Sequence, residues 1–275
     1  MAKSLAPVAT PAAWAEPSSL VAFLQDTAAI TEVELRKVRH DPTELVMRAA
    51  QPVLWLLIFG EVMASTRAIA TGSLPYLDFL APGILAQSAL FSAIFYGITV
   101  VWERDLGIVQ RYLVTPASRA ALVSGKALAA GLRALSQALI VYVLALILGV
   151  HAILDPLRLV GVGVAVVLGS AAFAMFSLSI ASLVKSRERV MGIGQLLTMP
   201  LFFASSAIYP VASMPNWLQA IAAVNPLTYM VGALRSLMVS PTFDATALAV
   251  DFIALGVTVT LLIAIATKLY PRVAV

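Results

Sequence analysis

Long hydrophobic runs with few or no charged residues dominate the chain. Because an α-helix rises 1.5 Å per residue, about 20 apolar residues cross the ~30 Å hydrocarbon core of a membrane. Runs of about this length, or slightly shorter, recur between charged or proline-containing stretches. The pattern predicts an all-α integral membrane protein with six transmembrane helices, over about 49–64, 79–101, 127–150, 159–184, 190–209 and 245–267.

The start of the chain has a different pattern. Residues 1–19 contain three prolines among small residues and no apolar run after a basic segment, so they predict a flexible cytoplasmic tail rather than a signal peptide. From Leu20 to Val38, apolar residues recur every three or four positions, and Asp41-Pro42 ends the pattern. This predicts an amphipathic helix, which either lies along the membrane surface or packs on another domain of the same complex.

The stretch 208–241 is apolar, but its prolines are too frequent for one straight helix. We expect short helices at the membrane interface or a re-entrant hairpin buried against protein, facing outward before the last span. Aromatic residues such as Trp217 and Tyr229 favour that depth.

Composition narrows the functional class. The chain is 61% hydrophobic and 12% charged, which excludes a soluble globular enzyme and a disordered protein. The absence of cysteine excludes disulfides and thiolate metal sites. With the N-terminus inside, fourteen of the eighteen Lys and Arg residues fall on inner segments and three on outer ones. This bias predicts cytoplasmic termini and explains the net charge of +4 without a nucleic-acid partner.

No catalytic, cofactor or metal site is expected on this chain. The nearest match to a nucleotide-binding loop, around Gly125-Lys126, fails because Ala120 replaces its first glycine and Ala127 replaces the hydroxyl that binds Mg²⁺. The two histidines, His40 and His151, stand outside any zinc-protease motif.

Polar residues inside the predicted spans are candidates for a transport path. Glu61, Arg133 and Asp251 lie near span ends, where a long side chain reaches water, and the pattern leaves their role in transport open. Uncharged residues lie deeper, where they either hydrogen-bond between helices or line a substrate path. These deeper residues are Gln87, Ser88, Ser92, Gln137, Gln195 and Thr198, and all of them except Gln137 are our candidates for the path.

The longest inner loop, 102–126, contains a short amphipathic pattern. Leu106, Val109 and Leu113 share one helical face, and Pro116 stops the helix. Such a helix serves either as an interfacial anchor or as a docking surface for a cytosolic partner, and the pattern alone favours neither.

Two blocks in the chain resemble the ABC-2-type transporter permeases, and most closely the daunorubicin-resistance and nodulation-factor-export types. The first is Glu103-Arg104-Asp105-x-Gly107, then Leu113-Val114-Thr115-Pro116-x-Ser118-Arg119 and Gly125-Lys126. The second is Ile208-Tyr209-Pro210-Val211, Met214-Pro215-x-Trp217-Leu218 and Asn225-Pro226-Leu227-Thr228-Tyr229, followed by Ala233-Leu234-Arg235.

The resemblance implies a single ABC-2-type transmembrane domain over 20–275, in a bacterial inner (plasma) membrane. It also implies a second, identical permease subunit and two cytosolic ATP-binding-cassette ATPases, which bind ATP and Mg²⁺ in place of this chain. Relatives export amphiphilic drugs, antibiotics, lipids or lipid-linked glycans, and transport would proceed by alternating access.

The resemblance also assigns roles to residues of the two blocks. The inner loop corresponds to a coupling helix that contacts the ATPase, through Glu103, Arg104, Asp105, Gly107, Arg111, Pro116 and Arg119. The broken stretch corresponds to an outer gate, formed by Tyr209, Pro210, Pro215, Trp217, Asn225, Pro226 and Tyr229. The alternatives are a secondary carrier driven by an ion gradient without an ATPase, and a scaffold protein that does not transport. Inverted repeats would indicate a carrier, and no internal symmetry is evident.

Overall fold

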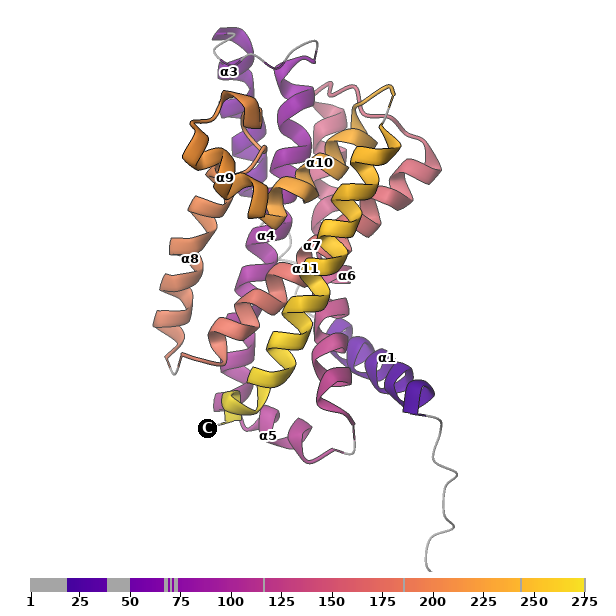
Figure 1. Ribbon diagram of the computed structural model, residues 1–275, viewed down its shortest axis with the longest axis vertical. Coiled ribbons are helices and arrows are strands. Elements are labelled where there is room, and N and C mark those ends of the chain that lie inside the picture. Colours follow the sequence, from indigo (N-terminus) through magenta and orange to yellow (C-terminus); the bar gives the residue numbers. More distant parts are fainter. Residues whose placement is uncertain are drawn as a thin grey trace, which may run out of the picture.

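The computed structural model describes residues 19–38, 50–66, 69, 71, 74–115, 117–184, 186–242 and 244–274. The structure is 84% helical, and no strand occurs within these ranges. The helices form an elongated bundle whose long helices run roughly along its length (Figure 1). The all-α prediction is therefore confirmed.

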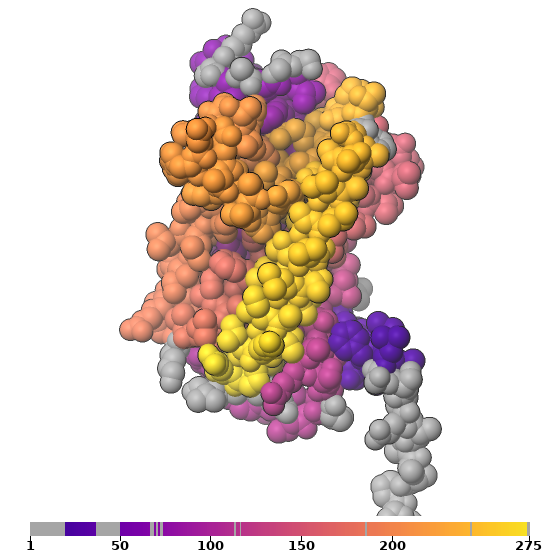
Figure 2. All heavy atoms as spheres, viewed as in Figure 1, coloured from indigo at the N-terminus to yellow at the C-terminus, as the bar shows by residue number. Residues whose placement is uncertain are grey.

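Four helices are long and apolar enough to cross a membrane. They are α4 (Tyr76–Asp105), α6 (Arg119–Ile147), α7 (Pro156–Ala181) and α11 (Ala245–Leu269). Helix α7 packs against the other three, and α4 is buried along most of its length. Helix α11 lies across one face and is largely exposed there (Figure 2), as expected for a lipid-facing helix.

The other two predicted spans are helices shorter than these four, and only the second is shorter than its predicted range. The first is a helical segment over 50–66, comprising a π-helical turn at Trp55–Gly60 and α3 (Glu61–Thr66). The second is α8 (Arg187–Phe203), 17 residues long with Pro200 in its last turn. The prediction that this helix continues to residue 209 is wrong, because residues 204–209 form turns and bends. Four candidate spans and one shorter apolar helix are thus present among the described residues, and six spans are not confirmed.

The two ends of the bundle carry different short elements. Helix α1 (Ser19–Val38), α5 (Ile108–Leu113) and the C-terminus lie at one end, whereas α3, α9 (Asn216–Val224) and α10 (Pro226–Met238) lie towards the other (Figure 1). Prolines set the breaks in the stretch 208–241, which we call the hairpin. A 3-10 turn, Val211–Ser213, follows Pro210, α9 follows Pro215, and α10 begins with Pro226. The hairpin is therefore a set of short helices, as predicted.

The amphipathic helix at the start of the chain packs against α6 of the same chain. Ile30 and Thr31 are buried there, and a Cβ atom added at Gly125 would come within 2.8 Å of Ile30. The predicted apolar face is only partly correct, because Leu20 and Leu24 are exposed. The predicted tail up to residue 18 and the helix end at Asp41-Pro42 lie outside the described residues.

Candidate transport path and coupling region

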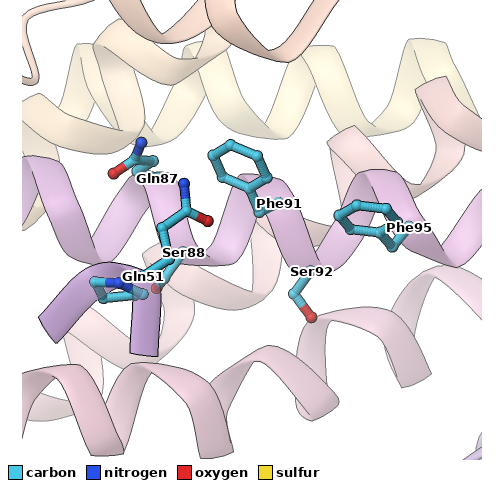
Figure 3. A pocket seen from close by; sticks show the side chains of 7 residues that line it. Gln51, Gln87, Ser88, Phe91, Ser92 and Phe95 are labelled. Atoms are coloured by element: carbon cyan, nitrogen blue, oxygen red, sulfur yellow. The ribbon is translucent and has the colours of Figure 1, made fainter. Parts of the chain in front are cut away.

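One cavity of the described structure, which we call the path cavity, lies on one side of α4. Its volume is about 230 Å³ and it opens to the surface. Phe91 and Phe95 stand one turn apart on α4 beside it (Figure 3). Among the described residues no charged side chain lines it, and the lining they form is Gln51, Pro52, Gln87, Ser88, Phe91, Ser92 and Phe95.

The polar groups of the path cavity differ in how well they are satisfied. The Ser88 hydroxyl donates to the Leu85 carbonyl at 2.7 Å. The Gln87 side chain is buried, and its amide nitrogen has no hydrogen-bond partner within the described part of the chain. A buried amide without a partner is costly, so a rotation of the side chain that lets this nitrogen donate to a ligand or water in the cavity would be favoured.

A smaller hollow of about 10 Å³ continues from the path cavity to α8. Phe91 and Phe95 line both, and Gln195 and Thr198 contribute from α8. Thr198 is buried and donates to the Gly194 carbonyl at 2.6 Å, whereas Gln195 is exposed. The structure therefore brings all five predicted path residues to one side of α4.

The three charged candidates lie elsewhere, and none lines either hollow. Glu61 is exposed at the start of α3. The Arg133 guanidinium lies 5.7 Å from the centroid of the Tyr96 ring. Asp251 is half-buried against α10, where an added Cβ at Gly232 would be 2.6 Å from its carboxylate.

At the opposite end from the hairpin, α4 passes into α5 through a two-residue turn. Gly107 has φ +72°, a left-handed conformation that favours glycine over residues with a Cβ atom. The expected common face is wrong, because Leu106 lies in the turn and is 71% exposed whereas Val109 is fully buried. The loop is also shorter than the predicted 102–126, since α6 already begins at Arg119, capped by the Ser118 hydroxyl.

An ion pair joins this turn to α8. Arg187 contacts the Asp105 carboxylate at 2.6 Å, and Arg104 contacts the same carboxylate at 3.2 Å. The Arg187 guanidinium also lies 5.5 Å from the Trp102 ring centroid. The predicted coupling residue Asp105 thus connects α4 to the start of α8, and the predicted coupling residue Arg104 binds the same carboxylate within α4.

Glu103 is not placed as the sequence led us to expect. Its side chain is 6% exposed and accepts a 2.7 Å hydrogen bond from the Lys126 ammonium, which also donates to Glu34 at 2.6 Å. Glu103 therefore cannot present its carboxylate to a partner surface. Arg111 and Arg119 are exposed, and Pro116 lies outside the described residues.

The hairpin is held mainly through backbone carbonyl groups. The Asn225 amide donates to the carbonyls of Leu201 and Ala204 at 2.7 and 2.9 Å, while its oxygen caps α10 at the Leu227 N–H. Arg235 donates to the carbonyls of Phe79 and Ser206 and lies 3.7 Å from the Phe79 ring centroid.

The other gate candidates lie in the same segment as Asn225. The Tyr209 and Tyr229 hydroxyls donate to the carbonyls of Phe203 and Ala223. Pro210, Pro215 and Pro226 begin or precede the three short elements, and Trp217 is exposed. All seven gate candidates therefore lie within one broken segment.

Sequence reasoning missed Glu34 as an interacting residue and placed Lys126 just before a span. One signal for Glu34 was available, because it lies three and four residues after Thr31 and Ile30 and therefore shares their buried face. The sequence carries no comparable signal for its partner, because Lys126 is 92 residues away.

The chain is similar to known transport proteins over most of its length. The family model described as ABC-2 type transporter matches residues 25–239. A putative transport permease, ycf38, of Cyanophora paradoxa is 27% identical over 78% of this chain and 74% of its own length. The daunorubicin resistance ABC transporter permease protein DrrB1 of Streptomyces coeruleorubidus is 26% identical over 73% of this chain and 70% of its own. Nodulation protein J of Rhizobium leguminosarum bv. viciae is 27% identical over 69% and 72%.

Proposed function

We propose that this chain is the permease of an exporter, because it belongs to the ABC-2 type transporter family. The permeases of this family are multi-pass, non-catalytic subunits that work with ATP-binding-cassette ATPases. Its substrate would be an amphiphilic drug, antibiotic, lipid or lipid-linked glycan. The complex would contain two copies of this chain and two ATPases in a bacterial inner membrane, with both termini in the cytoplasm. The 50–66 segment and α8 would complete six crossings.

The path cavity carries this proposal. Its described lining combines two phenylalanine rings with amide and hydroxyl groups and includes no charged side chain, which suits an amphiphile better than an ion. After a rotation of its side chain, Gln87 would offer its unpartnered amide nitrogen to a polar group, while Phe91 and Phe95 offer an apolar surface. A substrate bound there would contact α4 and the helix that contains Gln51 and Pro52.

Helix α5 is the proposed contact with the ATPase. It lies at the end of the bundle away from the hairpin, and exposed residues around it include Arg111 and Val114. ATP and Mg²⁺ would bind only to the ATPase. Closure of the two ATPases would displace α5, and the long helices would carry this motion to the hairpin in an alternating-access cycle.

The test is purification of the tagged chain from gently solubilised membranes, followed by an ATPase assay. We expect a soluble ATPase to copurify stoichiometrically, with vanadate-sensitive activity that an anthracycline or a lipid substrate stimulates. Gln87→Leu should raise the half-stimulating concentration about tenfold, since it removes one hydrogen bond to the substrate.

Gln137→Leu is the matched control. Gln137 is a buried glutamine on α6 that does not line the path cavity, so its substitution should leave the half-stimulating concentration unchanged. Equal effects of the two substitutions would contradict the proposed role of the cavity. Purification of the chain alone, without ATPase activity, would contradict the proposed complex.

A further inference from the structure

Three charged side chains from three helices meet inside the bundle and form what we call the buried triad. Lys126 of α6 donates hydrogen bonds to Glu34 of α1 and Glu103 of α4. The distances are 2.6 and 2.7 Å, and the three side chains are 1%, 1% and 6% exposed. A single ammonium group therefore links helices that are far apart in the sequence.

Burial on this scale is costly for charged groups, and the ion pairs only partly offset that cost. Apolar side chains of similar volume would often give the same stability. What an ion triad adds is geometry, because two short hydrogen bonds from one nitrogen fix the relative positions of α1, α4 and α6. The triad is therefore better explained by positioning than by stability.

The surroundings of Lys126 extend this link to α5 and the C-terminal segment. The Tyr112 ring of α5 lies 5.4 Å from the ammonium, and the Tyr96 ring of α4 lies 5.8 Å away. Tyr270, in the C-terminal 3-10 segment Tyr270–Ala274, is fully buried in the same hydrophobic core, and this segment packs against α5.

Helix α1 is seated immediately beside the triad. The Thr31 hydroxyl, which donates to the Thr27 carbonyl at 2.7 Å, also lies 3.2 Å from the Gly125 carbonyl, and the absence of a side chain at Gly125 lets α1 approach α6 closely. On the other side, Glu103 belongs to the last turn of α4, and only Leu106 and Gly107 separate α4 from α5. Val109 of α5 is fully buried, so α5 cannot shift without disturbing these contacts.

We infer that Lys126 is a positioning residue that joins α1, α4, α5 and α6 into one rigid unit, so that a displacement of α5 is transmitted to α1 and the bundle through Glu34 and Glu103. This inference rests on the proposed function. It also changes the role of Glu103, which acts through Lys126 and not by contact with the ATPase.

The decisive variant replaces all three charges at once, as Glu34→Met, Glu103→Met and Lys126→Met. Methionine is flexible and close in volume to both residue types, so this triple variant avoids an uncompensated buried charge. The control is Glu32→Gln with Arg36→Gln, which removes an exposed ion pair from α1. Both variants should reach the membrane at parental levels and copurify with the same ATPase.

The first readout is substrate transported per ATP hydrolysed in proteoliposomes. We expect the triple variant to lose at least tenfold in this ratio while it keeps basal ATPase activity, and the control to match the parent. A purely structural triad would change the yield of protein but not this ratio. An unchanged ratio in the triple variant would overturn the inference.

The second readout is a distance between two spin labels, for which the cysteine-free chain is a ready background. The labels are attached through Ala29→Cys on α1 and Gln110→Cys on α5, because both residues are exposed. In the parent, this distance should stay narrow and unchanged between the ATP-free and vanadate-trapped states. In the triple variant it should broaden, and an equally narrow distribution would overturn the inference.

The two proposals fail in different ways. A parent that neither recruits an ATPase nor transports substrate would overturn the proposed function and this inference with it. If the parent is active and the triple variant has the same transport ratio and the same label distance as the parent, the inference is overturned and the proposed function stands.

Discussion

The two ends of the bundle are held by different kinds of polar contact. At the α5 end, side chains pair with side chains, as in the buried triad and in the contact of Asp105 with Arg187. At the hairpin end, Asn225 and Arg235 donate to backbone carbonyls, and the side-chain pair of Asp78 with His151 has a largely exposed histidine. No carboxylate within the described residues forms an ion pair with Arg235 at salt-bridge distance.

This difference separates a rigid end from a switchable one. An ion pair between side chains fixes the relative position of two neighbouring helices, and it is kept when the helices move together. A side chain bound to carbonyls in turns, such as those at Ala204 and Ser206, keeps its partners only while that backbone conformation persists. We therefore expect the α5 end to move as one body and the hairpin to open by breaking carbonyl contacts.

The largest expected effect is at the triad. Lys126→Met alone leaves two buried carboxylates without their cation, and it should lower the free energy of unfolding by about 3–5 kcal/mol. Unfolding in a mixed-detergent titration measures this change. The triple methionine variant should recover most of the loss, and a triple variant as unstable as the single one would show that the triad is needed for stability.

At the hairpin, Arg235→Met should have the next largest effect. It removes the charge-assisted, partly buried hydrogen bonds to the carbonyls of Phe79 and Ser206. The free energy of unfolding should fall by about 2–3 kcal/mol. Hydrogen exchange should rise in residues 204–209 and not in α5. Increased exchange at α5 as well would contradict the separation of the two ends.

Asn225 offers a finer test of the same end. Asn225→Ala removes the cap of α10 and both carbonyl contacts, for an expected loss of about 1–2 kcal/mol. Asn225→Asp keeps the capping oxygen but loses the two donors. If the carbonyl contacts hold the gate, both variants should raise ATPase activity without substrate, whereas an effect of alanine alone would assign it to the cap.

The smallest expected change in stability is at Gly107. Gly107→Ala places a side chain at φ +72° and should cost about 1 kcal/mol. Gly107→Pro is incompatible with this φ and should displace α5, so that ATPase activity is uncoupled from transport while the chain still inserts. Transport at the parental rate in the proline variant would contradict the assignment of α5 as the coupling helix.

The parts of the fold that depend on local signals could be predicted from the sequence. Length and hydropathy were sufficient for the four long helices, and the prolines marked the breaks in the hairpin. Helix ends were less predictable, because charged residues such as Arg119 and Lys126 fall inside α6, where the sequence suggested a loop. Hydropathy cannot reveal that Lys126 is neutralised by partners from other helices.

The same limit applies to the candidate sites. Gln87, Ser88 and Ser92 could be selected as uncharged polar residues within a span, and they do line the path cavity. Gln51 and Pro52, which complete it, come from another helix, and their approach to α4 is a tertiary contact that the sequence does not encode locally. Burial of Glu103 was missed for the same reason, since its partner lies on α6.

The most direct test of the proposed function is a transport assay in proteoliposomes that contain the purified chain with its copurified ATPase. A fluorescent anthracycline and a labelled lipid serve as probes, with ATP, ATP plus vanadate, or an imposed proton gradient as the energy source. We expect movement that requires ATP, stops with vanadate and does not respond to the gradient. Transport driven by the gradient in the absence of the ATPase would contradict the proposed function and identify a secondary carrier.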